Sequence, residues 1–190
     1  MSTARMGSAQ DSTAWRDSVN AYWMRMDAEF ADSLESPLKP ADRAHFSHLQ
    51  RFAPDRSYWV EASFTAAQDP VPFAMKTSTT RLPMYKVHGT LTFTLNNQDF
   101  TLPVYEDAVP NPAYPGHLFL PFTDLTNGEE TYGGGRYLDL QAPLGATVVV
   151  DFNRSYNPYC AYNDRYSCPI PPIENHIDAQ VRAGVLKYHD

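Results

Sequence analysis

Residues that could carry chemistry are concentrated between positions 131 and 176 of this sequence. Two carboxylates in that stretch, Asp151 and Glu174, are the predicted acid/base residues of an active site. A carboxylate acts as a general base near neutral pH only where burial raises its pKa. Glu174 has an alternative role, because a helix dipole stabilises a carboxylate at the start of a helix. We therefore predict a catalytic pair, with helix capping as the alternative for Glu174.

Arg136 is the predicted anion-binding residue, and it directly follows the glycines at 133–135. A guanidinium binds a carboxylate or phosphate through two parallel hydrogen bonds. The glycines predict a turn between strands, since neither a Gly-Lys-Ser/Thr ending nor a helical pattern follows them. The competing role of Arg136 is a buried ion pair with Asp139, Asp151 or Glu174. Further ligand-binding candidates for the same polar pocket are Tyr132, Asn153 and Asn175.

The two cysteines, Cys160 and Cys168, are followed by His176 and suggest a third kind of site. Zinc needs three or four ligands, so the fourth here would be Asp151, Glu174 or water. The cysteine spacing is unlike that of short Cys-x2-Cys zinc knuckles. A disulfide or redox pair and two packed thiols are the alternatives. For His176, which lies at the edge of an apolar face, a packed histidine is the alternative. No cofactor is specified by these residues.

Composition and absent motifs exclude several classes of function. The sequence has no Gly-x-Ser-x-Gly elbow, His-Glu-x-x-His helix or dinucleotide fingerprint, which excludes the easily recognised hydrolases, zinc proteases and dehydrogenases. A net charge of −7 with scattered cations argues against nucleic-acid binding. No apolar run of about 18 residues predicts a membrane span. The first ten residues lack the apolar core of a signal peptide, so we expect a cytoplasmic protein.

The elements that must position these residues predict one mainly β (α+β) domain. The 16 prolines exclude a helical bundle, because a helix interior rarely tolerates proline. Short alternating strands instead favour a curled antiparallel sheet or small barrel, flanked by N- and C-terminal helices. The expected segments are a flexible N-terminus at 1–14, then a domain at 15–190 with an amphipathic helix at 15–35, a sheet at 57–152, a Pro/Tyr/Asn-rich loop at 153–172 and a helix at 173–184.

Particular strands and the last helix follow from local patterns. Asn96-Asn97 lies between two alternating runs and predicts a tight hairpin, because asparagine tolerates positive φ. Further strands are expected at 117–122, 136–140 and 146–152. The C-terminal helix rests on Ile173, Ile177 and Val181, which are spaced four apart after a Pro-Pro pair. Gly184 is placed as its C-terminal cap.

Three stretches of the sequence resemble one family. They read Thr-Tyr-x-x-Gly-Arg-Tyr-Leu, Asp-Phe-Asn-x-x-Tyr-Asn-Pro-x-Cys-Ala-Tyr and Cys-Pro-x-Pro-Pro-x-Glu-Asn, at positions 131–138, 151–162 and 168–175. They are similar to the bacterial and archaeal domain-of-unknown-function family numbered 1684. The similarity is specific over 119–184 and looser over 36–106. It implies one compact domain, and it implies no reaction and no catalytic residue.

The expected function is that of a small-molecule-binding domain, because small ligands usually bind at the mouth of a curled sheet. Arg136 would hold an anion there, and Asp151 or Glu174 would exchange a proton. The alternative is a non-catalytic structural or interaction module, in which the same residues form ion pairs and caps. A metal or thiol site is the third hypothesis. No nucleic-acid or membrane partner is expected, and an exposed apolar edge or helix stripe would equally support a homodimer.

Overall fold

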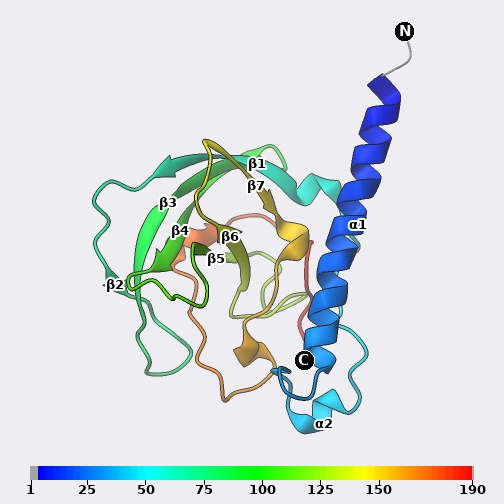
Figure 1. Ribbon diagram of the computed structural model, residues 1–190, viewed down its shortest axis with the longest axis vertical. Helices are drawn as coiled ribbons and strands as arrows, with labels where there is room; N and C mark the ends of the chain where they lie inside the picture. Colours follow the sequence, from blue (N-terminus) through cyan, green and yellow to red (C-terminus); the bar gives the residue numbers. More distant parts are fainter. Residues whose placement is uncertain (1–3, 190) are drawn as a thin grey trace.

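A curled antiparallel sheet and one long helix beside it build the fold (Figure 1). The computed structural model describes residues 4–189 of the chain. The sheet forms a half-barrel, with the strand order β6-β5-β4-β3-β1-β7. In addition, β2 pairs with β3, and β8 pairs with β5 in the parallel direction. The predicted mainly β class and curled antiparallel sheet are therefore confirmed.

The longer strands agree with the predicted ones, whereas the two-residue strands β2 and β8 were not predicted. They are β1 (Trp59–Ala66), β2 (Phe73–Ala74), β3 (Met84–Leu95), β4 (Gln98–Asp107), β5 (His117–Asp124), β6 (Arg136–Gln141), β7 (Thr147–Asp151) and β8 (His176–Ile177). The hairpin between β3 and β4 turns at Asn96 and Asn97, whose φ angles are 52° and 62°. Two successive residues with positive φ match the right-handed twist of the strands, which is why asparagine serves in this turn.

Strands β5 and β6 position side chains on two different faces. They pair in antiparallel register, with Phe119 opposite Asp139 and Phe122 opposite Arg136. Because side chains alternate along a strand, the even-numbered residues of both strands face the inside of the curl and the odd-numbered ones face outward. The inner residues Leu120, Phe122 and Leu138 belong to the main core. The outer residues Phe119 and Tyr137 belong to a separate aromatic cluster.

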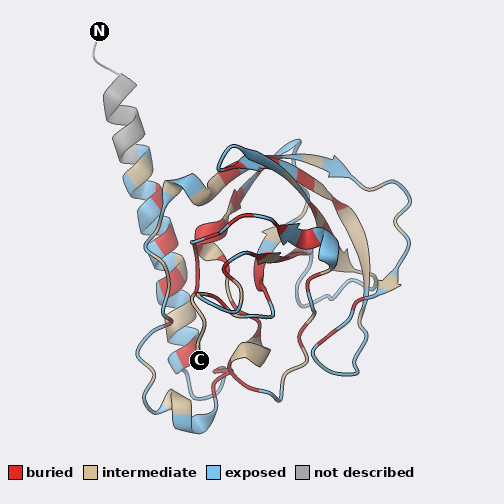
Figure 2. Cartoon of the chain, turned by 180° about the vertical axis from the view of Figure 1, so that it is seen from behind, coloured by how far each residue is buried: buried red, intermediate tan, exposed pale blue. Residues whose placement is uncertain are grey.

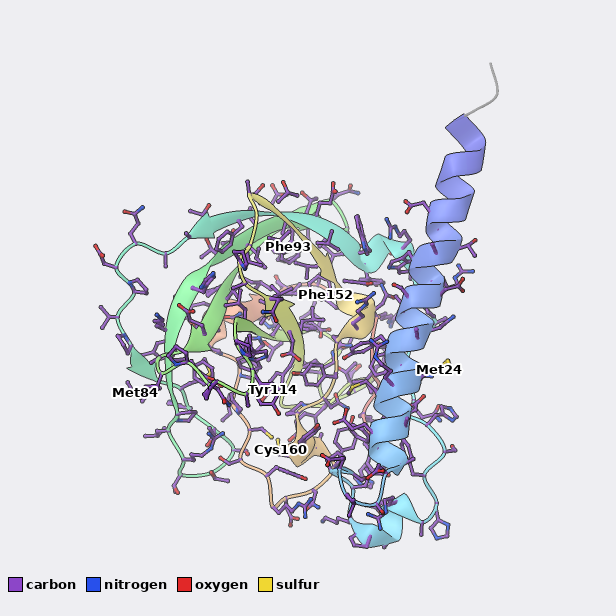
Figure 3. All side chains as sticks on the ribbon, in the orientation of Figure 1. Met24, Met84, Phe93, Tyr114, Phe152 and Cys160 are labelled. Atoms are coloured by element: carbon purple, nitrogen blue, oxygen red, sulfur yellow. The ribbon has the colours of Figure 1, made fainter. Side chains whose placement is uncertain are left out.

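The main core fills the inside of the curl. Phe93 from β3 and Phe152 lie there with ring centroids 5.6 Å apart, and both are labelled in Figure 3. Phe122 meets Phe152 edge to face at 5.3 Å. Such aromatic pairs add stabilisation beyond the apolar area they bury. Figure 2 shows the buried residues gathered inside the curl and on the helix side that faces it.

Helix α1 (Ala4–Ala31) confirms the predicted N-terminal helix and shifts its ends. Residues 4–14, which were expected to be flexible, are part of it, whereas residues 1–3 lie outside the described residues. The helix stops at Ala31 because the Asp32 carboxylate accepts the backbone N–H groups of Leu34 and Glu35. Leu34 is consequently 89% exposed instead of extending the apolar stripe. The stripe that does pack on the domain contains Trp15, Val19, Trp23 and Phe30.

Short turns connect the longer elements. They are α2 (Pro40–Arg43), η1 (Arg56–Tyr58), η2 (Phe152–Arg154), η3 (Tyr159–Ala161) and η4 (Ile173–Asn175). None of the helices at positions 4–189 is both long enough and apolar enough to span a bilayer.

The predicted C-terminal helix at 173–184 is wrong. Its first residues form η4, β8 follows at once, and the chain then runs in extended form across the sheet. We name residues 177–185 the C-terminal strap. Its odd-numbered residues are buried, namely Ile177, Ala179, Val181, Ala183 and Val185. Residues four apart lie on one side of a strand as well as of a helix, so that spacing alone did not discriminate. Gly184 does have a positive φ of 78°, in a bend of the strap.

Candidate functional site

A cavity of about 470 Å³ lies outside the half-barrel, between α1, the outer faces of β5 and β6 and the loop at 153–172. Its walls are mostly aromatic, and we name it the tyrosine pocket after six of its lining residues: Tyr22, Tyr85, Tyr137, Tyr156, Tyr159 and Tyr166. Phe119 lines it too, and Met26 and Glu29 face it from α1. Aromatic walls with a few polar groups are typical of small-molecule sites.

A hydrogen-bonded triplet of His117, Asp139 and Tyr156 forms one wall of the tyrosine pocket. Nε2 of His117 lies 2.8 Å from Oδ1 of Asp139, and the Tyr156 hydroxyl donates to both carboxylate oxygens at 2.8–2.9 Å. The side chains of His117 and Asp139 are 41% and 46% exposed, so solvent and a ligand can reach them. The hydrogen bond to Asp139 raises the pKa of His117 above its ordinary value. The carboxylate therefore favours the protonated form of the His117 ring.

Two further tyrosine hydroxyls of the tyrosine pocket also donate within the protein. Tyr137 donates to the backbone oxygen of Pro169, and Tyr159 donates to Oε1 of Glu29 at 2.9 Å. Burial raises the pKa of Tyr85 to about 12. These hydroxyls consequently keep their protons at neutral pH, and the pocket wall offers neutral rings.

Asp151, a predicted catalytic residue, lines a second cavity of about 390 Å³ that shares Tyr22 and Asp139 with the tyrosine pocket. Its Oδ2 accepts the indole N–H of Trp15 at 2.9 Å, and its Oδ1 accepts from Asn153 at 2.9 Å. The carboxylate thus ties α1 to the end of β7. Its hydrogen bonds serve the attachment of the helix, and it lies apart from Glu174, the other predicted acid/base residue, which is exposed in η4.

Arg136, the predicted anion-binding residue, is completely enclosed inside the half-barrel. Its guanidinium donates to Asp124 at 2.7 Å and to the backbone oxygens of Val181 and Ala183. The alternative of a buried ion pair is the one that the structure shows, with Asp124 in place of the three partners expected. Arg136 lines neither of the two cavities. Asp139 is excluded as its partner because residues three apart on a strand face opposite sides.

The remaining ligand-binding candidates do not share one pocket. Asn153 is buried and bonds the backbone N–H and oxygen of Asp55. Asn175 is also buried, but beside strand β4, where it accepts a hydrogen bond from the Tyr105 hydroxyl at 2.8 Å and donates to the backbone oxygen of Pro103. Tyr132 is the exception that approaches a reactive group, since its hydroxyl lies 3.8 Å from the sulfur of Cys160.

Cys160 and Cys168 are free thiols that contact each other. The backbone N–H of Cys160 donates to Sγ of Cys168 at 3.1 Å. A hydrogen bond from the Cys168 thiol lowers the pKa of Cys160 to about 6. Cys168 is buried and lines the tyrosine pocket, whereas Cys160 is half-buried beside Tyr132. The two sulfurs therefore share a proton at the rim of that pocket, in an arrangement that favours thiolate chemistry.

The structure does not bring Cys160, Cys168 and His176, the three metal-ligand candidates, into one group. His176 lies at β8, where its Nδ1 is 2.9 Å from the hydroxyl of Thr123. Within the part of the chain that the structure describes, no group of three His, Cys, Asp or Glu residues could hold a metal ion. The reason is that His176 belongs to β8, which pairs with β5 at Thr123.

The sequence did not single out His117, Asp139 and Tyr156 as a site. His117 lies outside the positions 131–176 that held the other candidates, and Asp139 was considered only as a partner of Arg136. The signal that could have found them is the alternation of β5 and β6, which places His117, Phe119, Tyr137 and Asp139 on one face. Only the long-range packing of α1 and the loop over that face turns it into a cavity.

This architecture defines a mainly β half-barrel with an aromatic cavity on its outer side. The model of the family described as Protein of unknown function (DUF1684) matches residues 44–186, and the chain belongs to that family. The uncharacterized protein from gene locus rrnAC0354 of Haloarcula marismortui has a similar solution NMR structure, with a TM-score of 0.73 and 34% sequence identity. The match covers 93% of this chain and 96% of that one. No functionally curated protein matches the sequence.

Proposed function

We propose that this protein binds a small organic molecule in the tyrosine pocket and that His117, held by Asp139, exchanges a proton with it. The observation that carries the proposal is a cavity of about 470 Å³ with six tyrosines and this half-exposed ion pair in its wall. Ligand pockets typically measure about 300–1,000 Å³ and combine apolar walls with a few convergent polar groups. The sequence predicted acid/base chemistry at Asp151 and Glu174. We assign it to His117 instead, because His117 lines the tyrosine pocket.

The histidine is suited to act as a general acid. Its raised pKa keeps a larger fraction of the ring protonated near neutral pH than in a free histidine. Asp139 fixes the ring through Nε2, and the Tyr156 hydroxyl in turn fixes Asp139. A histidine that is oriented by a carboxylate is a common arrangement in sites that transfer protons.

The test is a pair of variants on opposite sides of α1. Met26→Trp places an indole in the tyrosine pocket, whereas Met24→Trp places the same group on the outer side, where Met24 is 71% exposed and points away from the domain (Figure 3). Native mass spectrometry of each protein with a collection of small organic molecules measures retained ligands. We expect Met24→Trp to bind the same compounds as the natural sequence and Met26→Trp to lose them.

Two outcomes contradict the proposal. If the natural sequence retains no compound, the alternative of a structural or interaction module is favoured. If Met26→Trp retains the same compounds as Met24→Trp, ligands bind elsewhere on the molecule. Thermal unfolding of both variants checks that any loss of binding is not a loss of folding.

A second candidate function, which we also propose, is thiol–disulfide exchange at Cys160 and Cys168. The observation that favours it is the contact of the two free thiols together with the pKa of Cys160, lowered to about 6. The Cys160 thiolate would attack a small disulfide such as oxidised glutathione and expel one thiolate, forming a mixed disulfide. The Cys168 thiolate would then attack Sγ of Cys160 and expel the second. Both protein thiols are oxidised, and one small disulfide is reduced to two thiols.

Mass spectrometry after incubation with oxidised glutathione tests this exchange. We expect the protein to lose two hydrogen atoms and to keep no glutathione, because Cys168 resolves the mixed disulfide. The Cys168→Ser variant should instead stop at one bound glutathione on Cys160. Two thiols that remain free in the natural sequence at pH 7 would contradict the exchange.

A further inference from the structure

We infer that the tyrosine pocket is built for an organic cation, with an ammonium group held between aromatic rings and carboxylates. This inference rests on the proposed function, because it names the chemical class of the ligand for the same cavity. It depends on the charges that line the cavity, on the use of the hydroxyl groups and on the angles between the rings.

The charges lining the tyrosine pocket are negative. Glu29 and Asp139 are carboxylates, and none of the described residues in the wall is a lysine or arginine. His117 is the one titratable base there, and it is already bonded to Asp139. The chain as a whole carries −7. A cation would be attracted by Glu29 and Asp139, whereas an anion would meet these carboxylates while His117 is already bonded to Asp139 and Arg165 to the Tyr166 hydroxyl.

Three of the six tyrosine hydroxyls of the tyrosine pocket donate their protons within the protein. The hydroxyl groups of Tyr137, Tyr156 and Tyr159 donate to Pro169, Asp139 and Glu29, respectively. These three protons are therefore used within the protein. The groups of the wall that can attract a positive charge are the aromatic rings and the remaining lone pairs of the two carboxylates. Both attract positive charge, since the face of an aromatic ring carries the negative part of its quadrupole.

The aromatic rings that line the tyrosine pocket stand at large angles to one another. Tyr137 meets Phe119 at an interplanar angle of 77° and Tyr156 at 90°. Tyr159 and Tyr166 close another side with an angle of 59°. Proteins recognise quaternary ammonium groups with several aromatic rings set at angles to one another.

Three probes of equal shape and different charge test the inference. They are choline, 3,3-dimethyl-1-butanol and 3,3-dimethylbutanoate, which carry a positive, a neutral and a negative charge, respectively. Each is titrated into the full chain at pH 8 and low salt, and its dissociation constant is measured by NMR. We expect choline to bind at least about tenfold more tightly than the alcohol, with the carboxylate weakest.

Matched variants place this preference in the tyrosine pocket. Glu29→Gln removes a carboxylate from the wall and should weaken choline about three- to tenfold, while the alcohol is unaffected. Glu35→Gln makes the same change of net charge on an exposed residue outside the cavity and should leave choline binding unchanged. Met26→Trp should abolish choline binding, and Met24→Trp should preserve it.

Equal affinity for the three probes, tighter binding of the carboxylate, or no saturable binding of choline overturns the cation inference. Equal weakening by Glu29→Gln and Glu35→Gln overturns it as well, because the effect would then be one of net charge. The same experiment tests the proposed function separately from the charge of the ligand. If the alcohol or the carboxylate binds and Met26→Trp abolishes that binding, the pocket stands and only the charge class is wrong.

Discussion

The hairpin of β5 and β6 carries two pairs of oppositely charging side chains, one on each face of the sheet. Arg136 and Asp124 pair at 2.7 Å inside the half-barrel, where both side chains are completely buried. His117 and Asp139 pair at 2.8 Å on the outer face, where both are nearly half exposed. The inner pair has its charges enclosed, and the outer pair borders a cavity. The comparison teaches that one hairpin encloses one charged pair in the core and leaves the other open to solvent, beside the cavity where we propose that a ligand binds.

The inner pair owes its existence to the extended C-terminal strap. The strap offers the backbone oxygens of Val181 and Ala183 to the guanidinium, and the backbone N–H of Val181 to Asp124. A helix would have consumed those backbone groups. Charges this deep are tolerated only when such partners satisfy them. Arg136 therefore holds the strap across the open side of the sheet.

The largest expected effect comes from breaking the inner pair. Arg136→Leu leaves the Asp124 carboxylate buried without its counter-charge and should lower the free energy of unfolding by about 3–5 kcal/mol. Urea denaturation measures the loss. The double variant Arg136→Leu with Asp124→Leu should recover part of it, because no charge is then left unpaired. A loss below about 1 kcal/mol for the single variant, the range of exposed pairs, would show that the inner pair is no different from the outer one.

How much of this the sequence predicted depends on the range of the interaction. The alternation of β5 and β6 follows from local residue types, and so do the hairpin at Asn96-Asn97 and the helix containing Trp15 and Trp23. The same local evidence was ambiguous for the strap, because Ile177 and Val181 share a face in both a helix and a strand. The extended conformation of the strap depends on hydrogen bonds from Arg136, which is distant in the sequence.

The site was less predictable than the fold, for the same reason. The sequence marked Arg136 as charged and Tyr132 as aromatic, and it identified the cysteine pair. It contained no signal for which of them face a cavity, since that depends on α1 covering the outer face of the sheet. His117 and Tyr156 are separated by 39 positions and meet through Asp139 only in the folded chain.

A smaller effect is expected at Asn175, which sharpens the distinction between buried and pocket-lining polar groups. Asn175→Ala leaves the Tyr105 hydroxyl and the Pro103 oxygen without a partner and should cost about 1–3 kcal/mol of folding free energy. Affinity for choline should not change, because Asn175 does not line the tyrosine pocket. Thermal unfolding and the NMR titration measure the two quantities. A weaker affinity with unchanged stability would restore Asn175 as a ligand-binding residue.

Asp139→Asn in the outer pair should change stability little, by about 0–1 kcal/mol, because the pair is exposed. Its effect should instead be on titration. The carboxylate raises the pKa of His117, so its removal should lower that pKa towards the ordinary value. NMR titration of the imidazole C–H protons measures the change. An unchanged His117 pKa would contradict the coupling.

The smallest expected effect is the pH dependence of stability that the outer pair contributes. The pKa of His117 is raised in the folded state, so its contribution is fully present below the ordinary histidine pKa. It is lost as the pH rises through the raised value. The stability difference between the natural sequence and Asp139→Asn should therefore shrink from pH 5 to pH 8 in urea denaturation. A difference that grows with pH would reverse the sign of the interaction.

The most direct test of the central claim is to locate a bound ligand by intermolecular NOEs between the methyl protons of choline and the ring protons of the protein. If the outer cavity is the binding site, the contacts come from Tyr137 and Tyr159, and they vanish in Met26→Trp. Contacts with Phe93 or Phe152 would place the ligand inside the half-barrel, and the distinction between an inner structural face and an outer binding face would then be wrong.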